Sequence, residues 1–223
     1  MFPYKDDNPS NTFPVVTLGI IVLNTVVFLL QVLSGEDGKQ IVYAFGAIPY
    51  NIVTMKATQP IHPALTLFTS MFMHGGLFHI FGNMLYLWIF GNNIEDRLGH
   101  FRFIFFYLFC GIAAAMSHAL LAPGSTVPMI GASGAISGVL GAYLLLFPYA
   151  RIHTIIFLGF FVQTIRIPAL IVIGFWAIIQ LLSGLTAQAI QNQGGIAWFA
   201  HVGGFIAGLV TVKLWQPRRS KPW

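Results

Sequence analysis

Residues 131–141 read Gly131-Ala-Ser-Gly-Ala-Ile-Ser-Gly-Val-Leu-Gly141, a run of glycine and other small residues in an apolar part of the chain. Gly134, Gly138 and Gly141 recur every three or four residues and therefore share one face of a helix. Residues 200–208 repeat small residues at four-residue spacing. Such faces let membrane helices approach closely, so we expect these two segments to pack together. Ordinary helix packing would produce the same pattern, so the glycines alone indicate no function.

The composition of the chain indicates a membrane protein. Of its 223 residues, 57% are hydrophobic and 8% are charged, against about 25% charged residues in soluble domains. A soluble fold of this size could not cover its surface with so few charges. The predicted fold class is therefore all-α, a polytopic helix bundle in a lipid bilayer. The net charge of +5 comes mostly from short loops and the carboxyl end, which argues against a nucleic-acid partner.

Apolar stretches divide the chain into six predicted transmembrane helices. They cover residues 14–33, 77–90, 103–121, 133–147, 167–183 and 197–215. We predict a six-helix membrane domain over residues 13–216. A short disordered tail, residues 1–12, precedes it, and a basic tail, residues 217–223, follows it.

The connections between the spans carry further expectations. Residues 34–63 are predicted to form a long irregular loop at the membrane interface, and residues 64–73 a short interfacial helix. Residues 91–102 are polar and predict a compact turn. Residues 149–166 predict either an interfacial hairpin or a helix extension. Their apolar part, Ile155 to Val162, would rise only about 12 Å as a helix, too little to cross a bilayer.

The basic residues predict the orientation of the bundle. With the amino terminus in the cytoplasm, only Lys39 and Lys56 lie in outside segments. The inside segments hold Lys5, Arg97, Arg102, Arg151, Arg166, Lys213, Arg218, Arg219 and Lys221. This imbalance follows the positive-inside rule, so we expect both termini in the cytoplasm.

Four polar side chains fall at a similar depth in this topology. His79 and Asn83 lie in the first turns of the second span, Ser133 opens the fourth, and His201 lies about one turn into the sixth. All three spans enter the membrane from the outer face. Polar groups are costly in lipid, so each needs a polar partner or a water-filled cavity. We expect the four side chains to share one cavity below the outer interface.

A serine near a histidine suggests a nucleophile with its base. Imidazole accepts protons near neutral pH and can activate a hydroxyl. The six acidic residues lie in the tail, the first loop and the inner turn, so a Ser133–His201 dyad is predicted rather than a triad with a carboxylate. His79, Asn83 and the Ser133 backbone amide are placed to stabilise an oxyanion. A serine at the head of a helix is, however, commonly just a cap.

These residues resemble the motifs of the rhomboid family of intramembrane serine proteases, in its prokaryotic six-helix form. The resemblance lies in Gly131-Ala-Ser133-Gly, in Ala200-His201-Val-Gly-Gly204 with Gly208, in the spacing of His74, His79 and Asn83, and in Glu95-Asp-Arg97-Leu-Gly99. It extends from residue 14 to residue 215. Gly131, Gly204 and Gly208 enter the predicted site as cavity or structural residues.

The resemblance implies an intramembrane endopeptidase with Ser133 as nucleophile and His201 as general base. Its substrates would be membrane-anchored proteins that enter sideways near the second and fifth spans. They would be cut within or near their transmembrane segment, beside small residues. His74 would line the cavity mouth, while Glu95 and Arg97 would stabilise the inner loop. We expect a multi-pass protein of the bacterial cytoplasmic membrane, with its active site open to the outer face.

One position departs from the family pattern. Many members carry an aromatic residue one turn after the nucleophile, where it stacks on the base. Here that position is Ser137. The sequence therefore leaves open how His201 is held.

Two other functions compete with the protease interpretation. A catalytically weak or silent relative that binds transmembrane helices would be expected to lose Ser133 or His201, and both are present. A transporter or haem protein could use His74, His79, His118 and His201 as ligands. His74 lies outside the span, however, and the chain has no His-Glu-x-x-His motif. We therefore predict no metal and no other cofactor.

Overall fold

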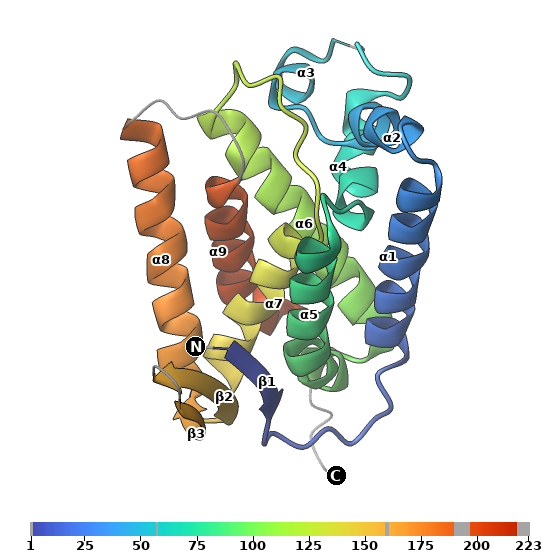
Figure 1. Ribbon diagram of the computed structural model, residues 1–223. Coiled ribbons are helices and arrows are strands. Elements are labelled where there is room, and N and C mark those ends of the chain that lie inside the picture. Colours follow the sequence, from blue (N-terminus) through green and yellow to red (C-terminus); the bar gives the residue numbers. More distant parts are fainter. Residues whose placement is uncertain (1, 57, 159–160, 190–196, 218–223) are drawn as a thin grey trace.

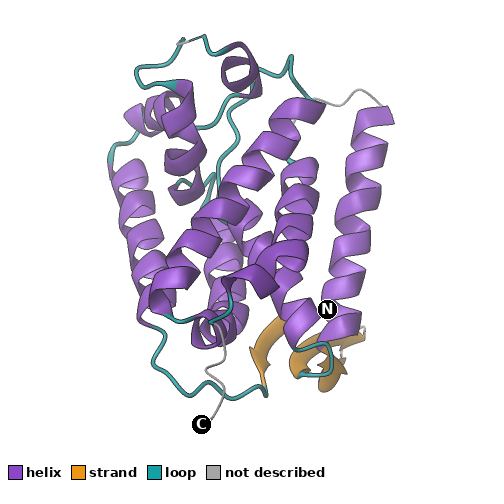
Figure 2. Ribbon diagram, turned by 180° about the vertical axis from the view of Figure 1, so that it is seen from behind, coloured by secondary structure: helices purple, strands orange, loops and turns teal. Residues whose placement is uncertain are grey.

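The computed structural model describes residues 2–56, 58–158, 161–189 and 197–217. Long helices run side by side in alternating directions, with short helices at one end and a small sheet at the other (Figure 1, Figure 2). The elements in chain order are β1 Phe2–Asp6, α1 Val15–Leu33, α2 Asp37–Phe45, α3 Pro49–Thr54, α4 Pro63–Thr69, the 3₁₀ helix η1 Ser70–Phe72, α5 Leu77–Leu98, α6 His100–Leu121, α7 Ser133–Leu146, β2 Arg151–Leu158, β3 Phe161–Pro168, α8 Ala169–Ala189 and α9 Trp198–Trp215.

Four of these helices, α1, α6, α8 and α9, are long and apolar enough to cross a membrane. The segments Pro63–Phe72 and Leu77–Leu98 make a fifth candidate if the 84° bend between them falls within one span. α7 has 14 residues and a length of about 21 Å, against about 30 Å for the hydrocarbon core. A polytopic membrane helix bundle is thus confirmed, while the count of six transmembrane helices remains a prediction.

α7 lies at the centre of the bundle, and every residue from Gly134 to Tyr143 is buried (Figure 1). Its closest partner is α9. A side chain at Gly208 would overlap the carbonyl oxygen of Gly138, and one at Gly204 would overlap that of Gly134. The two helices therefore touch backbone to backbone, which confirms the packing predicted from the spacing of small residues.

The polar turn predicted at residues 91–102 is wrong. α5 continues to Leu98 and α6 begins at His100, so Gly99 alone separates them, at φ +81°. A left-handed backbone at this position favours glycine, which allows the chain to reverse within one residue. The polarity of the segment has another cause, because several of its side chains bond to neighbouring elements.

Glu95 is the clearest example. Its buried carboxylate accepts hydrogen bonds from the backbone N–H groups of Val16 at 2.9 Å and Thr17 at 2.7 Å. α1 has no side-chain cap of its own, so a residue on α5 satisfies the first amides of that helix. Arg97, in contrast, is exposed and has no hydrogen bond or ion pair with the described residues.

A three-stranded antiparallel sheet departs from the all-α prediction. β1 pairs with β2, and β2 pairs with β3. For residues 149–166 the hairpin alternative is confirmed over the described residues. The disordered tail predicted at residues 1–12 is wrong, because residues 2–6 form the strand β1.

Side chains reinforce the attachment of this first strand. The Tyr143 hydroxyl, near the end of α7, donates to the Asp6 carboxylate at 2.6 Å. The Asp7 carboxylate lies 2.6 Å from Nε2 of His153 on β2. Both partners lie far along the chain, so the local composition of the tail could not reveal them.

The loop predicted at residues 34–63 contains two short helices, α2 and α3. α2 ends just before Gly46 and α3 begins at Pro49, two residue types that interrupt a continuous helix. The short helix predicted at residues 64–73 is present as α4 and η1. These short elements cover the end of the bundle from which the loop to α7 descends (Figure 1).

Candidate active site

Ser133 is the first residue of α7, and the loop before it enters the bundle from the end of α6 (Figure 1). The N–H of Gly131 fastens this loop by donating to the carbonyl of Ser70 at 2.9 Å. Gly131 has a φ of +122°, and a Cβ built on it would lie 2.7 Å from Nε2 of His79. Conformation and space both require glycine here, and its absence of a side chain lets the His79 ring approach the loop.

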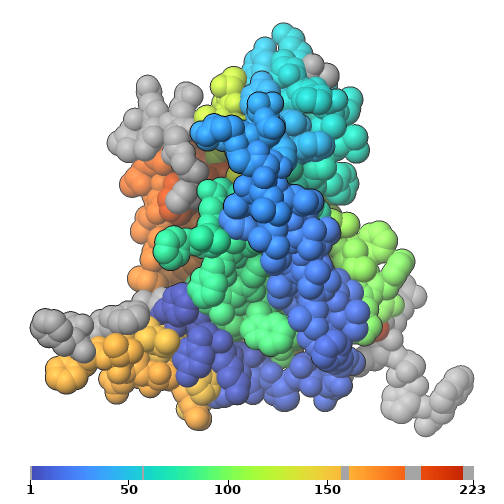
Figure 3. Space-filling view, turned by 45° about the vertical axis from the view of Figure 1, so that its right-hand side comes forward, coloured from blue at the N-terminus to red at the C-terminus, as the bar shows by residue number. Residues whose placement is uncertain are grey.

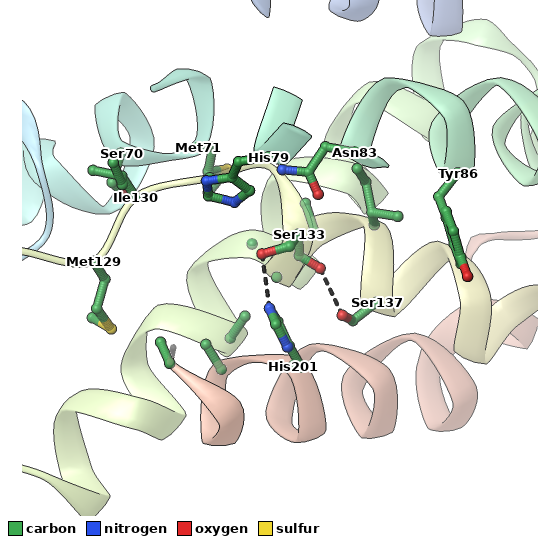
Figure 4. A pocket seen from close by; sticks show the side chains of 18 of the residues that line it. Ser70, Met71, His79, Asn83, Tyr86, Met129, Ile130, Ser133, Ser137 and His201 are labelled. Atoms are coloured by element: carbon green, nitrogen blue, oxygen red, sulfur yellow. Dashed lines mark hydrogen bonds between the residues drawn. The ribbon is translucent and has the colours of Figure 1, made fainter. Parts of the chain in front are cut away.

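Ser133 and His201 meet across the α7–α9 contact. Oγ of Ser133 lies 2.8 Å from Nε2 of His201, although the residues are 68 positions apart (Figure 4). The glycine faces of the two helices set this distance, because they hold the backbones together on the same side of the bundle. A hydroxyl at hydrogen-bond distance from an imidazole nitrogen can lose its proton to that nitrogen.

The opposite nitrogen of His201 has a partner that sequence analysis did not single out. Nδ1 lies 2.6 Å from Oε1 of Gln180, a buried residue of α8. Trp176, one turn before Gln180, has its ring centroid 6.2 Å from that of His201, and Trp198 approaches from another side at 6.3 Å. These three residues hold the imidazole. A glutamine inside an otherwise apolar span was the only signal available in the sequence.

Ser137 does not contribute to holding the histidine. Its hydroxyl donates to the Ser133 carbonyl at 2.6 Å, within α7 itself. Aromatic support for the imidazole comes instead from tryptophans on α8 and α9.

His79 and Asn83 lie on the other side of Ser133 from His201 (Figure 4). Nδ1 of His79 accepts the N–H of Gly75 at 3.2 Å, so a neutral ring carries its proton on Nε2, the nitrogen nearest Gly131. Nδ2 of Asn83 is buried and has no hydrogen-bond partner among the described residues. α7 starts without a side-chain cap, so its first N–H groups also remain available as donors.

The four predicted polar residues all line one cavity of about 580 Å³. Trp176 and residues of the loop before α7 complete its wall, together with Tyr86 and the small residues of α6. Polar side chains and space for water occur together at this place, which is what burial of such groups requires.

His74 does not line this cavity. Its ring is buried with 2% of its surface exposed, and it packs edge-on against His79 with the centroids 5.1 Å apart. Gln31 of α1 bonds both to the N–H and to the carbonyl of His74, which turns the side chain inward. The expected place at the cavity mouth is therefore wrong, and His74 instead supports His79 from behind.

The haem or metal alternative requires several ligands around one point. Within the described residues, no group of three or more His, Cys, Asp or Glu side chains could hold a metal ion. The two ring nitrogens of His201 face Ser133 and Gln180.

A serine paired with a histidine inside an apolar helix bundle places the protein among the membrane-embedded helical proteins. Comparison with known proteins then identifies its family. A family model described as "Rhomboid domain" matches residues 62–217. The chain belongs to the rhomboid family, which confirms the resemblance found in its motifs.

Individual relatives agree with this assignment. Over 205 residues, or 92% of this chain and 34% of the relative, the sequence is 29% identical to rhomboid protease GluP of Bacillus subtilis. It is 31% identical to the mitochondrial rhomboid protein 1 of Saccharomyces cerevisiae over 66% of this chain and 40% of that protein. The mouse mitochondrial presenilin-associated rhomboid-like protein is 35% identical over 66% of this chain and 36% of its own length. The chain spans between a third and a half of these relatives.

Proposed function

We propose that the protein is an intramembrane serine endopeptidase that cleaves membrane-anchored proteins within or near their transmembrane segments. The observation that carries this proposal is the 2.8 Å contact between Oγ of Ser133 and Nε2 of His201 in a cavity inside the bundle. Membership of the rhomboid family and the similarity to the rhomboid protease GluP support it.

The reaction would proceed by acyl transfer. His201 accepts the hydroxyl proton as Ser133 Oγ attacks the carbonyl carbon of the scissile peptide bond, and it then passes the proton to the leaving amine. Water entering the cavity would hydrolyse the acyl-enzyme, with His201 again as base. The volume of about 580 Å³ leaves room for an extended peptide segment and for this water.

The groups opposite His201 would stabilise the negative oxygen of the tetrahedral intermediate. Nε2–H of His79, the Asn83 amide and the Ser133 backbone N–H are the proposed donors. Among the described residues Asn83 Nδ2 has no partner, which supports this role, because a buried donor without a partner is costly unless a ligand satisfies it. A prepositioned donor of this kind contributes a factor of about 10² to 10³ in rate.

In the membrane, we propose that α5 and α7 complete six spans and that the sheet end of the bundle faces the cytoplasm. Ser133 would then lie below the outer surface of a bacterial cytoplasmic membrane. Sideways entry is proposed from the side of α5 and α8. On that side β1 lies against β2 and α5 (Figure 3), and Phe2 of β1 stacks on Phe81, in the second turn of α5, at 6.4 Å between ring centroids.

A covalent probe tests the proposal directly. The purified protein in detergent is expected to react with a fluorophosphonate, and peptide mapping by mass spectrometry is expected to locate the adduct on Ser133. The same preparation should cleave single-span model substrates whose transmembrane segments contain small residues. Heat-denatured protein serves as the control, since the label depends on activation of the hydroxyl by His201.

The opposite outcome would favour a different function. If protein shown to be monodisperse and helical remained unlabelled and left a panel of single-span substrates intact, the endopeptidase proposal would be abandoned. Capture of those substrates without cleavage would then indicate a rhomboid-like protein that binds transmembrane helices.

Replacing Asn83 by alanine tests the oxyanion argument. We expect kcat to fall by about 10² to 10³ with a much smaller change in KM, because the donor acts mainly in the transition state. Thermal stability should change little, since Nδ2 makes no hydrogen bond in the described structure. Asn92→Ala, near the other end of α5, provides the matched control. Equal activity of Asn83→Ala and wild type would remove Asn83 from the site.

A further inference from the structure

The base of the proposed dyad has a buried partner on each ring nitrogen. Nε2 of His201 faces the Ser133 hydroxyl at 2.8 Å and Nδ1 faces Oε1 of Gln180 at 2.6 Å. A carboxamide oxygen can only accept hydrogen bonds, so Nδ1 must be the nitrogen that carries the proton. In neutral imidazole this leaves Nε2 unprotonated, which is the form able to take the proton of Ser133.

The surroundings of Gln180 show that this contact is built into the fold. The side chain is 8% exposed, on a helix whose neighbouring residues are apolar. A glutamine in such a place is costly unless it finds a partner, and the described structure pairs it with His201. Trp176 and Trp198 pack against the same ring and restrict its rotation. Rotation of the imidazole would also break its hydrogen bonds to Ser133 and Gln180 together.

The acidic residues cannot take this position. Asp6, Asp7, Glu95 and Asp96 bond to groups at the sheet end of the bundle, and Glu36 and Asp37 lie at the start of α2. Serine hydrolases with a triad use a carboxylate to orient the histidine. An uncharged oxygen can do the same orienting without placing a charge inside the membrane.

We propose that Gln180 is a positioning residue that fixes the tautomer and the orientation of His201. The proposal rests on the proposed function, in which His201 is the general base. It changes the predicted dyad into a chain of three residues, Ser133, His201 and Gln180, contributed by α7, α9 and α8. Gln180 touches no substrate and acts through the imidazole alone.

Substitution of Gln180 by leucine keeps a similar volume and removes the acceptor. We expect kcat to fall by about 10² or more with KM nearly unchanged, since an enzyme whose histidine takes the wrong tautomer loses up to about 10⁴. The rate of fluorophosphonate labelling should fall in parallel. Gln180→Glu restores an acceptor and is expected to recover most of kcat, with the acidic limb of its pH–rate profile displaced from that of wild type. Gln188→Leu, at an exposed position of the same helix, is the matched control.

A spectroscopic measurement separates this proposal from the proposed function. In protein labelled with ¹⁵N-histidine, His201 is expected to show a protonated Nδ1 and an unprotonated Nε2, and Gln180→Leu is expected to lose this preference. Wild-type kcat and an unchanged tautomer in folded Gln180→Leu would overturn the role of Gln180 and leave the protease standing. An inactive wild type that still showed the Gln180-dependent tautomer would overturn the protease and leave the positioning contact intact.

Discussion

Replacing Ser133 by alanine is expected to abolish both cleavage of membrane-anchored substrates and labelling by fluorophosphonate. Ser133 supplies the only atom that forms a covalent bond in the proposed reaction, and no other hydroxyl lies at hydrogen-bond distance from His201 in the described structure. Serine hydrolases lose on the order of 10⁶ in kcat when the nucleophile is removed. Gel-based detection of the probe and of the substrate fragments measures both effects in one preparation.

The fold should survive this change, because Ser133 is not a cap for its own helix and its side-chain partner is His201. Thermal unfolding of Ser133→Ala should therefore resemble that of wild type. Ser117→Ala is the control, since that hydroxyl donates to the carbonyl of Ala113 within α6 and has no other hydrogen bond to a described residue. Persistent labelling of folded Ser133→Ala would place the reactive group elsewhere and refute the proposed nucleophile.

The second large effect is expected on stability, from Gly208→Ala. A methyl group at this position would overlap the carbonyl oxygen of Gly138, which is backbone and cannot rotate away. α7 and α9 would have to separate, and overpacking of a well-packed interface costs about 3 kcal/mol or more in severe cases. We expect a clear fall in the midpoint of thermal unfolding and a loss of activity, since the same interface sets the distance between Ser133 and His201.

Gly174→Ala is the matched control for this prediction. Gly174 lies on α8, and a Cβ built on it meets no other atom within 4 Å. Alanine favours a helix over glycine by about 1 kcal/mol, so this variant should be as stable as wild type or slightly more stable. If Gly208→Ala unfolded at the same temperature as Gly174→Ala, close contact of the α7 and α9 backbones would not be what holds the bundle together.

The sequence predicted the centre of the molecule better than its edges, for physical reasons. Apolar length and small-residue spacing predicted the central packing of α7 on α9, because both are local patterns that a bilayer enforces. The same reasoning put Ser133, His201, His79 and Asn83 at one depth, and the structure places all four on one cavity. Their catalytic roles remain predictions.

The features that sequence analysis missed depend on partners far away in the chain. β1 forms only because β2, about 150 residues later, offers it an edge. α5 extends to Leu98 because the polar residues near its end find partners elsewhere, as Glu95 does at the start of α1. Gln180 belongs to none of the family motifs, and its meaning is apparent only once α8 and α9 stand side by side.

The attachment of β1 also makes the sheet respond to acid in two opposite ways. Burial raises the pKa of the Asp6 carboxyl, so its contribution to stability is full below about pH 3.9, the unfolded value, and is lost as pH rises through the raised pKa. The hydrogen bond with His153 lowers the pKa of Asp7, whose contribution is present above about pH 3.9 and lost as pH falls through the lowered pKa. Mild acidification therefore strengthens the contact of the first strand with the end of α7 through Asp6, and stronger acid weakens its contact with β2 through Asp7.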